Sequence, residues 1–252
     1  MANRIQKNKN QSSAPAQKRT GGKRAAVLFI ALAAICAAAF AATRAPASIA
    51  VGIGALFAAA ITFFISTSAP ANTNQKTAAK YYGDFGEQKT GDILEHYLPE
   101  DYTLVQNLTL HYAGGTSEID AIVIGKSGVF IIEIKNVKGT IRGDYADYEW
   151  LQDKIDRYGI EHPKNLYNPT KQVGTHIWRL AKFLRENKID TYVQGAVYFA
   201  NPESALALSG EEGKIPVFSY RQTPALLEYI YAGNAQLSAA KIQSIVRLLD
   251  EI

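Results

Sequence analysis

The hydrophobic and polar positions along the chain divide it into two regions. Residues 25–43 and 49–65 contain no charged side chain, and each run is about as long as a helix needs to cross the hydrocarbon core of a bilayer. After residue 80 the apolar residues recur at helical spacing or in short runs bounded by turn residues, as in a globular domain. The pattern predicts a membrane hairpin of two helices followed by a folded domain at 80–252.

The folded region alternates helices with strands. Helices are predicted at 78–98, 168–187, 224–231 and 238–249. Strands are predicted at 104–110, 118–124, 129–135, 139–142, 148–151, 192–199 and 215–218. Elements mixed in this order predict a three-layer α/β domain with a central mixed sheet.

The charges are divided as unevenly as the apolar residues. The chain has 27 Lys and Arg residues, and residues 1–70 hold eight of these and no acidic residue. The basic pI therefore belongs to the N-terminal segment and is no evidence for a nucleic-acid-binding domain. We expect residues 1–24 to be a disordered basic tail and residues 66–79 to be a linker.

The distribution of basic residues also predicts an orientation in the membrane. All of those in residues 1–70 except Arg44 precede the first apolar run, which places the N-terminus in the cytosol. Two crossings return the chain to that side, so we expect a multi-pass protein of the cytoplasmic (inner) membrane with its C-terminal domain in the cytosol. One alternative is a cleaved signal peptide, but a second apolar run follows the first at once. The other is a buried soluble helical hairpin, but then neither helix would present a charge to water. The single cysteine excludes an intramolecular disulfide framework.

A hairpin in the folded region brings charged side chains together. If its turn is centred between Lys126 and Ser127, Asp120 faces Glu133 and Glu118 faces Lys135, all on one face. Directly opposed Cβ atoms lie about 5 Å apart, close enough for two carboxylates to share a divalent cation. Both faces of the hairpin are otherwise apolar, so its charged end is half buried. Either Lys135 neutralises the carboxylates in a structural ion network, or Asp120 and Glu133 hold Mg²⁺ (or Mn²⁺) and Lys135 positions or activates a water.

Asp120, twelve intervening residues and then Glu133-Ile134-Lys135 resemble the signature of the PD-(D/E)XK nuclease superfamily, and more closely that of the NERD (nuclease-related) domain. The further matching stretches are Gly86-Glu87, Glu118-Ile119, residues 128–132, Asn136, Lys138-Gly139, Trp150, Asn168-Pro169 and Gln172. The resemblance implies a restriction-endonuclease-like core, metal-dependent phosphodiester hydrolysis and a bacterial origin. Ile119 stands where the superfamily's name has proline.

The resemblance also implies roles for individual residues. Asp120 and Glu133 would be metal ligands, Lys135 the catalytic lysine and Glu87 a further acidic ligand. Glu87 has an equally good explanation as a solvated helix residue or cap. Gln172 would lie near the site, although a helix-surface amide is the commoner explanation for such a residue. Glu118 is expected to orient Lys135.

Basic side chains near these residues are candidates for contacts with a phosphate backbone. They are Lys138, Arg142, Lys171, Arg179 and Lys182. A charge stripe on an exposed helix is more often simply solvated.

Taken together, the apolar runs and the charged hairpin predict a membrane-anchored, metal-dependent nuclease acting on DNA or RNA. The alternative is a non-catalytic module of the same fold that binds nucleic acid or a protein partner at the membrane.

Overall fold

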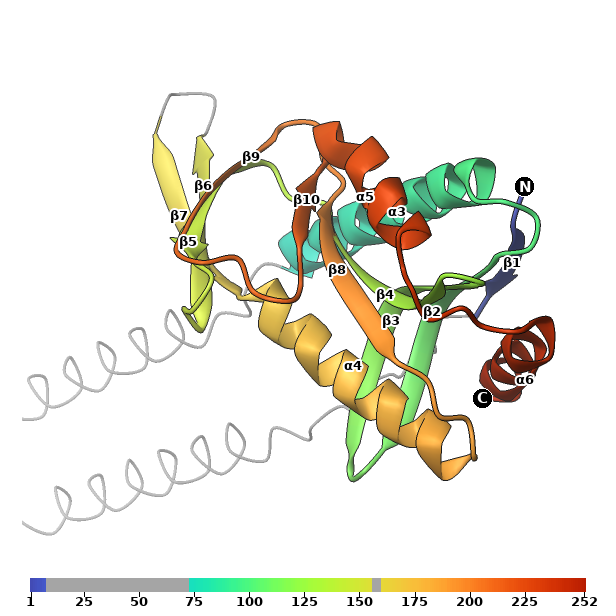
Figure 1. Ribbon diagram of the computed structural model, residues 1–252. Coiled ribbons are helices and arrows are strands. Elements are labelled where there is room, and N and C mark those ends of the chain that lie inside the picture. The colour runs from blue at the N-terminus through green and yellow to red at the C-terminus, as the bar shows by residue number, and fades with distance from the viewer. Residues whose placement is uncertain (8–72, 156–159) are drawn as a thin grey trace, which may run out of the picture. The chain divides into compact units, whose positions relative to one another are not determined.

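The central sheet has six strands in the order β1-β2-β3-β4-β8-β10 (Figure 1). Their bounds are β1 (Asn3–Gln6), β2 (Thr103–Tyr112), β3 (Gly115–Gly125), β4 (Gly128–Lys135), β8 (Val193–Phe199) and β10 (Val217–Ser219). β2, β3 and β4 are antiparallel neighbours, whereas the pairs β1–β2, β4–β8 and β8–β10 are parallel. The sheet is therefore mixed, as the sequence predicts.

This computed structural model describes residues 1–7, 73–155 and 160–252. The predicted membrane helices at 25–43 and 49–65 lie outside the described residues, as do most of the predicted tail and the first half of the predicted linker. Residues 73–79 of the predicted linker are helical instead, at the start of α3 (Thr73–Tyr97). Within the described residues, no helix combines the length and the hydropathy that a bilayer crossing requires.

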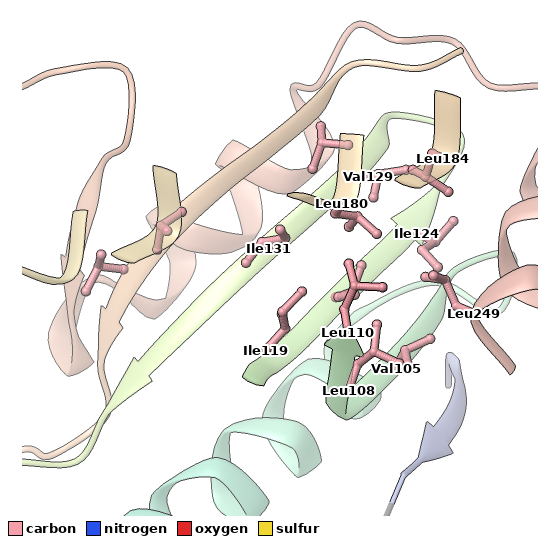
Figure 2. Close-up of a cluster of buried hydrophobic side chains, with 14 of the residues drawn as sticks. Val105, Leu108, Leu110, Ile119, Ile124, Val129, Ile131, Leu180, Leu184 and Leu249 are labelled. Carbon is pink, nitrogen blue, oxygen red and sulfur yellow. The ribbon is translucent and has the colours of Figure 1, made fainter. Parts of the chain in front are cut away.

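Helices cover both faces of the sheet. α3 (Thr73–Tyr97) and α5 (Thr223–Tyr231) contribute to a core that includes Leu94, Phe130 and Ile132. α4 (Pro169–Glu186) and α6 (Ala239–Asp250) contribute to a second core on the opposite face (Figure 2). Successive side chains of β3 and β4 point to opposite faces, so both strands contribute to both cores. The three-layer α/β architecture and the central place of the hairpin are thus confirmed.

A smaller sheet extends from the same end of β4 and β8. Its order is β7-β6-β5-β9, with β5 (Gly139–Asp144), β6 (Glu149–Ile155), β7 (Glu161–Tyr167) and β9 (Ser204–Ser209). The sequence predicts β5 and β6 but misses β7 and β9. β7 is polar and contains Pro163, and β9 is a half-buried run of Ala and Leu without β-branched or aromatic residues, so neither has the composition that identifies a strand.

The prediction that residues 1–24 are a disordered tail is wrong at its beginning. Asn3–Gln6 form β1, which pairs in parallel with Thr103–Gln106 of β2. Arg4 donates to Asp92 at 2.6 Å and to Glu95 at 3.1 Å, both on α3. The ion pairs and the free edge of β2 order a segment that is too polar to order itself. Residues 1–7 are consequently part of the same compact unit as the domain after residue 77.

Gly195 of β8 permits the close approach of α4 to the sheet. A Cβ atom added there would lie 2.5 Å from Val173 Cγ1 and 3.0 Å from the Ile131 carbonyl oxygen. Gly195→Ala should therefore destabilise the protein by about 1–3 kcal/mol, the usual effect of overpacking. Thermal unfolding followed by circular dichroism measures the change.

The matched control is Gly213→Ala, because a Cβ there would meet no heavy atom within 4 Å. We expect the control to lie within about 0.5 kcal/mol of wild type. Equal midpoints for the two variants would contradict the close seating of α4 on β8.

Candidate active site

The β3–β4 hairpin opens at Asp120. The two strands pair with the predicted register from Gly125–Gly128 to Ala121–Ile132, and the pairing ends there. Beyond that point the Asp120 carboxylate accepts a hydrogen bond from the Ile134 backbone N–H at 2.8 Å. A side chain thus takes the place of a main-chain partner, and the strands separate at the position where the sequence predicts the charged site.

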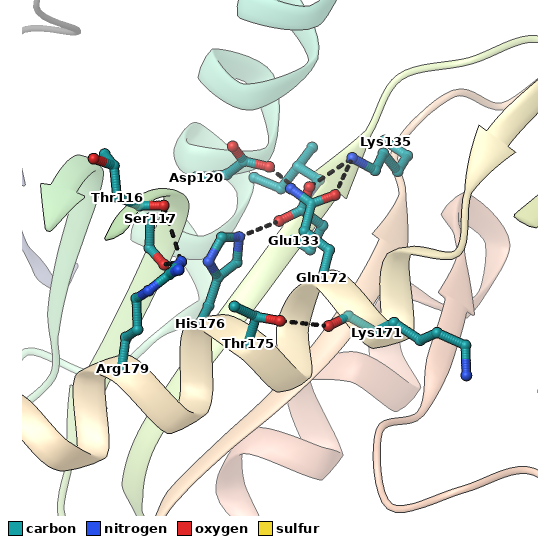
Figure 3. A network of polar contacts seen from close by, with 11 residues as sticks. Thr116, Ser117, Asp120, Glu133, Lys135, Lys171, Gln172, Thr175, His176 and Arg179 are labelled. Atoms are coloured by element: carbon teal, nitrogen blue, oxygen red, sulfur yellow. Dashed lines mark hydrogen bonds and ion pairs between the residues drawn. The ribbon is translucent and has the colours of Figure 1, made fainter. Parts of the chain in front are cut away.

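Lys135 is held by two neighbours on the same side of this opening. Its Nζ donates to Glu133 Oε1 at 2.6 Å and to Gln172 Oε1 at 3.1 Å (Figure 3). Gln172 lies in the first turn of α4, whose start is fixed by Asn168: the Asn168 side chain caps the Thr170 N–H and donates to the Tyr145 and Asp147 carbonyls. The structure therefore brings Gln172 into the predicted cluster.

Glu118 does not have the position that the sequence predicts. It is exposed, and within the described residues Lys135 Nζ is hydrogen-bonded to Glu133 and Gln172 instead. The expectation that Glu118 orients Lys135 is wrong because it extends the register of the hairpin past Ala121–Ile132, where the strands have already separated.

His176 is a member of the site that sequence reasoning missed. Its Nε2 lies 3.5 Å from Glu133 Oε2, and both side chains are almost fully buried. Within the described residues, neither imidazole nitrogen nor Glu133 Oε2 has a hydrogen-bond partner. The available signal was helical spacing, since His176 follows Gln172 by one turn and shares its face of α4.

Glu87 approaches the site from α3. A Cβ at the preceding Gly86 would lie 2.3 Å from Asn136 Cβ, so only glycine lets the helix come this close to the end of β4. Gln106 Nε2 donates to the Glu87 carbonyl at 3.1 Å and anchors the same turn to β2. The Glu87 side chain is buried, which argues against a solvated helix residue.

The carboxylates of the cluster differ in acidity. Burial raises the pKa of Asp120 well above its ordinary value, and the nearby charges of Glu133 and Glu87 raise it further. Burial also acts to raise the pKa of Glu133, but His176 and Lys135 outweigh it, so this pKa lies below its ordinary value. Glu133 is thus the ionised partner of Lys135, and Asp120 is the carboxyl that retains its proton more strongly.

The donor set fits a hard divalent cation. Asp120 and Glu133 converge, Glu87 adds negative charge nearby, and Glu133 Oε2 is buried without a hydrogen-bond partner within the described residues. No group of three or more His, Cys, Asp and Glu side chains in the described residues has the geometry to hold a metal ion. Mg²⁺ usually takes one or two carboxylates and several waters as ligands. Asp120 and Glu133 can supply the carboxylates.

The five basic candidates for nucleic-acid contacts are distributed over two places. Lys138 and Arg142 line a groove beside the site, where they pair with Glu203 and Asp153. Lys171 and Lys182 lie on α4, and the Lys171 side chain points away from Glu133 (Figure 3). Arg179 donates to the Thr116 carbonyl and to Ser117 Oγ, both at 2.9 Å, so it ties α4 to β3.

Comparisons with known proteins place the described site within a matched region of the chain. Residues 82–200 match the model of the NERD family, described as a nuclease-related domain, so the chain carries a nuclease-related domain over these residues. An uncharacterized protein of Bacillus anthracis is 34% identical over 105 residues, which is 41% of this chain and 47% of that protein. The match thus spans about half the length of this relative. No solved structure matches the chain significantly.

The acidity of Asp120 predicts how its removal affects stability. Because its pKa is raised in the folded protein, metal-free stability begins to fall as the pH rises above the unfolded value of a carboxyl group, and the loss is complete above the folded value. Asp120→Asn removes this loss of stability, and its side-chain amide oxygen can still accept the hydrogen bond from the Ile134 N–H. In EDTA at pH 8 the variant should therefore melt at a higher temperature than wild type, and the difference should shrink towards pH 5.

Metal should reverse that order. Mg²⁺ or Mn²⁺ at 100 times its dissociation constant would stabilise wild type by about 2.7 kcal/mol, and Asp120→Asn much less. The control is Glu118→Gln, which removes an exposed carboxylate from the same strand and should behave as wild type in both conditions. Equal metal-induced shifts in wild type and Asp120→Asn would count against a metal at this position.

Proposed function

We propose that this protein is a membrane-anchored, divalent-metal-dependent nuclease of the PD-(D/E)XK type. The observation that carries the proposal is the convergence of Asp120, Glu133, Lys135 and Gln172 where the hairpin opens, with Lys135 Nζ 2.6 Å from Glu133 Oε1. The nuclease-related match over residues 82–200 supports the same class of reaction. The substrate is the phosphodiester backbone of DNA or RNA.

Each side chain has a part in the hydrolysis. Asp120 and Glu133 would hold Mg²⁺ or Mn²⁺, which supplies Lewis-acid activation of the phosphate and of a water. The Lys135 ammonium, fixed by Glu133 and Gln172, stabilises negative charge that develops on the phosphate oxygens and orients the attacking water. Water then adds to phosphorus and releases a proton to solvent, the bond to the leaving oxygen breaks, and that oxygen takes up a proton from solvent.

The anchor of this nuclease is the segment between the described parts of the chain. β1 precedes it and α3 follows it, and both pack in one domain. Residues 1–7 and the domain after residue 77 must therefore lie on the same side of any membrane that the segment crosses. An even number of crossings satisfies this condition, and the apolar runs at 25–43 and 49–65 supply two. We assign both ends of the chain to the cytosolic side, in line with the positive-inside rule.

Activity is tested on the full-length protein in detergent with plasmid, single-stranded DNA and RNA. We expect cleavage with Mg²⁺ or Mn²⁺, none with EDTA, and a loss of at least about 100-fold in Lys135→Ala, since one charge-stabilising group is worth that much. Lys214→Ala, which removes an exposed lysine from the loop before β10, is the control and should cleave normally. If no substrate is cut and metal does not raise the melting temperature, the protein is a non-catalytic module with a buried ion network.

The topology is tested by cysteine labelling in whole cells. In a Cys36→Ala background, Arg44→Cys between the two apolar runs should react with a membrane-impermeant maleimide. Lys188→Cys, exposed after α4, should react only once the membrane is opened. Labelling of Lys188→Cys in intact cells would refute the cytosolic assignment.

A further inference from the structure

A groove of about 770 Å³ lies beside the candidate active site. One wall comes from the chain just after Lys135, where Asn136 leads into β5. Strands β6 and β7 and the segment after β8 form others, and Tyr82 of α3 also lines it. We call this space the β5–β7 groove. Since Asn136 directly follows Lys135, a chain molecule lying in the groove would pass the site.

Two lysines in the groove have no charged partner among the described residues. Lys138 and Arg142 pair with Glu203 and Asp153, but Lys154 and Lys164 form no hydrogen bond or ion pair within the described residues. In the β6–β7 register Lys164 pairs with Gln152, so Lys154 and Lys164 are diagonal neighbours on one face. Diagonal neighbours lie about 7–8 Å apart, and their Cβ atoms somewhat less, which is close to the separation of successive phosphates in an extended strand.

Tyr82 adds an aromatic surface at the same groove. Its side chain is 58% exposed, whereas its backbone is held: Asn136 Nδ2 donates to the Tyr82 carbonyl at 2.6 Å, and Asn201 Nδ2 donates to Asn136 Oδ1 at 3.0 Å. An exposed ring on a fixed backbone is a stacking surface for a base. A base offers its face to such a ring only where it is unpaired, so the combination favours a single strand over a duplex.

The charge of the rest of the domain makes this groove distinctive. Acidic residues outnumber basic ones after residue 70, so most of the domain repels a polyanion. Lys154 and Lys164 provide a local exception next to the active site. Paired lysines and an adjacent aromatic ring are the usual elements of single-strand binding grooves.

We propose that the β5–β7 groove binds a single-stranded segment of nucleic acid, with phosphates on Lys154 and Lys164 and a base stacked on Tyr82. The groove leads this strand to Lys135. The inference rests on the proposed function for the identity of the polymer as substrate, but the binding itself is measurable without cleavage.

Binding is measured by fluorescence anisotropy on full-length protein in detergent, with Asp120→Asn and EDTA present so that nothing is cut. The probes are a labelled 12-nucleotide DNA strand, the matching RNA strand and the DNA duplex of the same sequence. We expect a single strand to bind more tightly than the duplex. Lys154→Glu with Lys164→Glu should weaken strand binding at least tenfold and make its dependence on salt shallower, since about 0.7 counterions are released per phosphate neutralised. Tyr82→Ala should weaken it by about fivefold or more, the effect of losing one stacked base.

The control is Lys188→Glu with Lys214→Glu, which makes the same charge change at exposed lysines that do not line the groove. The basic N-terminal segment contributes equally to both double variants, so the comparison isolates the groove. Equal affinities of the two double variants, or tighter binding of the duplex than of either strand, would overturn the proposal. Circular dichroism checks that both double variants are folded.

Cleavage of a small diester, bis(p-nitrophenyl) phosphate, separates this inference from the proposed function. This diester is too small to span the groove and the site. With Asp120 restored, the Lys154→Glu and Lys164→Glu double variant should therefore cleave strands more slowly and cleave the diester as wild type does. Strand binding that depends on these lysines without cleavage of any substrate would refute the nuclease and retain the groove. A parallel loss of both activities would overturn the groove as a binding site separate from the chemistry.

Discussion

The hydrogen bond from the Ile134 N–H to the Asp120 carboxylate is the interaction on which the site depends. The β3–β4 hairpin is buried on both faces, and a buried carboxylate without a partner would cost several kcal/mol. Ending the ladder at Ala121–Ile132 frees a backbone donor for Asp120 and opens space for Glu133 and Lys135. A continuous ladder would offer neither, so the interruption of the sheet and the presence of the charged cluster are one structural feature.

Two helices depend on small residues to reach this opening. Gly86 lets α3 lie against Asn136, and Gly195 lets α4 lie against β8, because any larger side chain would clash. The first contact brings Glu87 near Asp120, and the second brings Gln172 to Lys135 and His176 to Glu133. The acidity of the carboxylates therefore follows from helix packing as much as from the hairpin itself.

The sequence predicts the hairpin better than its surroundings, for physical reasons. The turn at Gly125 and Gly128 determines the register by arithmetic, and apolar residues on both faces identify a central position. His176 could not be assigned to the site because the relation between Glu133 and α4 is set by tertiary packing. β1, β7 and β9 each pack only one or two large apolar side chains against the core, and they depend also on strand pairing and on ion pairs such as Arg4–Asp92, so local patterns do not detect them. These side chains are Ile5, Leu166, Leu206 and Leu208.

The pattern of satisfied and unsatisfied groups favours a functional cluster over a purely structural one. A structural ion network is stable when every buried charge and donor has a partner, since a partly satisfied network is worse than an apolar core. Here Lys135 is well held, yet Glu133 Oε2 and His176 Nε2 meet only each other, at 3.5 Å, and His176 Nδ1 is buried without a hydrogen bond in the described part of the chain. Asp120 keeps its raised pKa beside two other carboxylates. Stability alone does not explain why three acidic side chains lie together here and why His176 Nδ1 is buried without a hydrogen bond in the described residues. A bound cation would compensate the acids, and the Lys135 ammonium would face a phosphate.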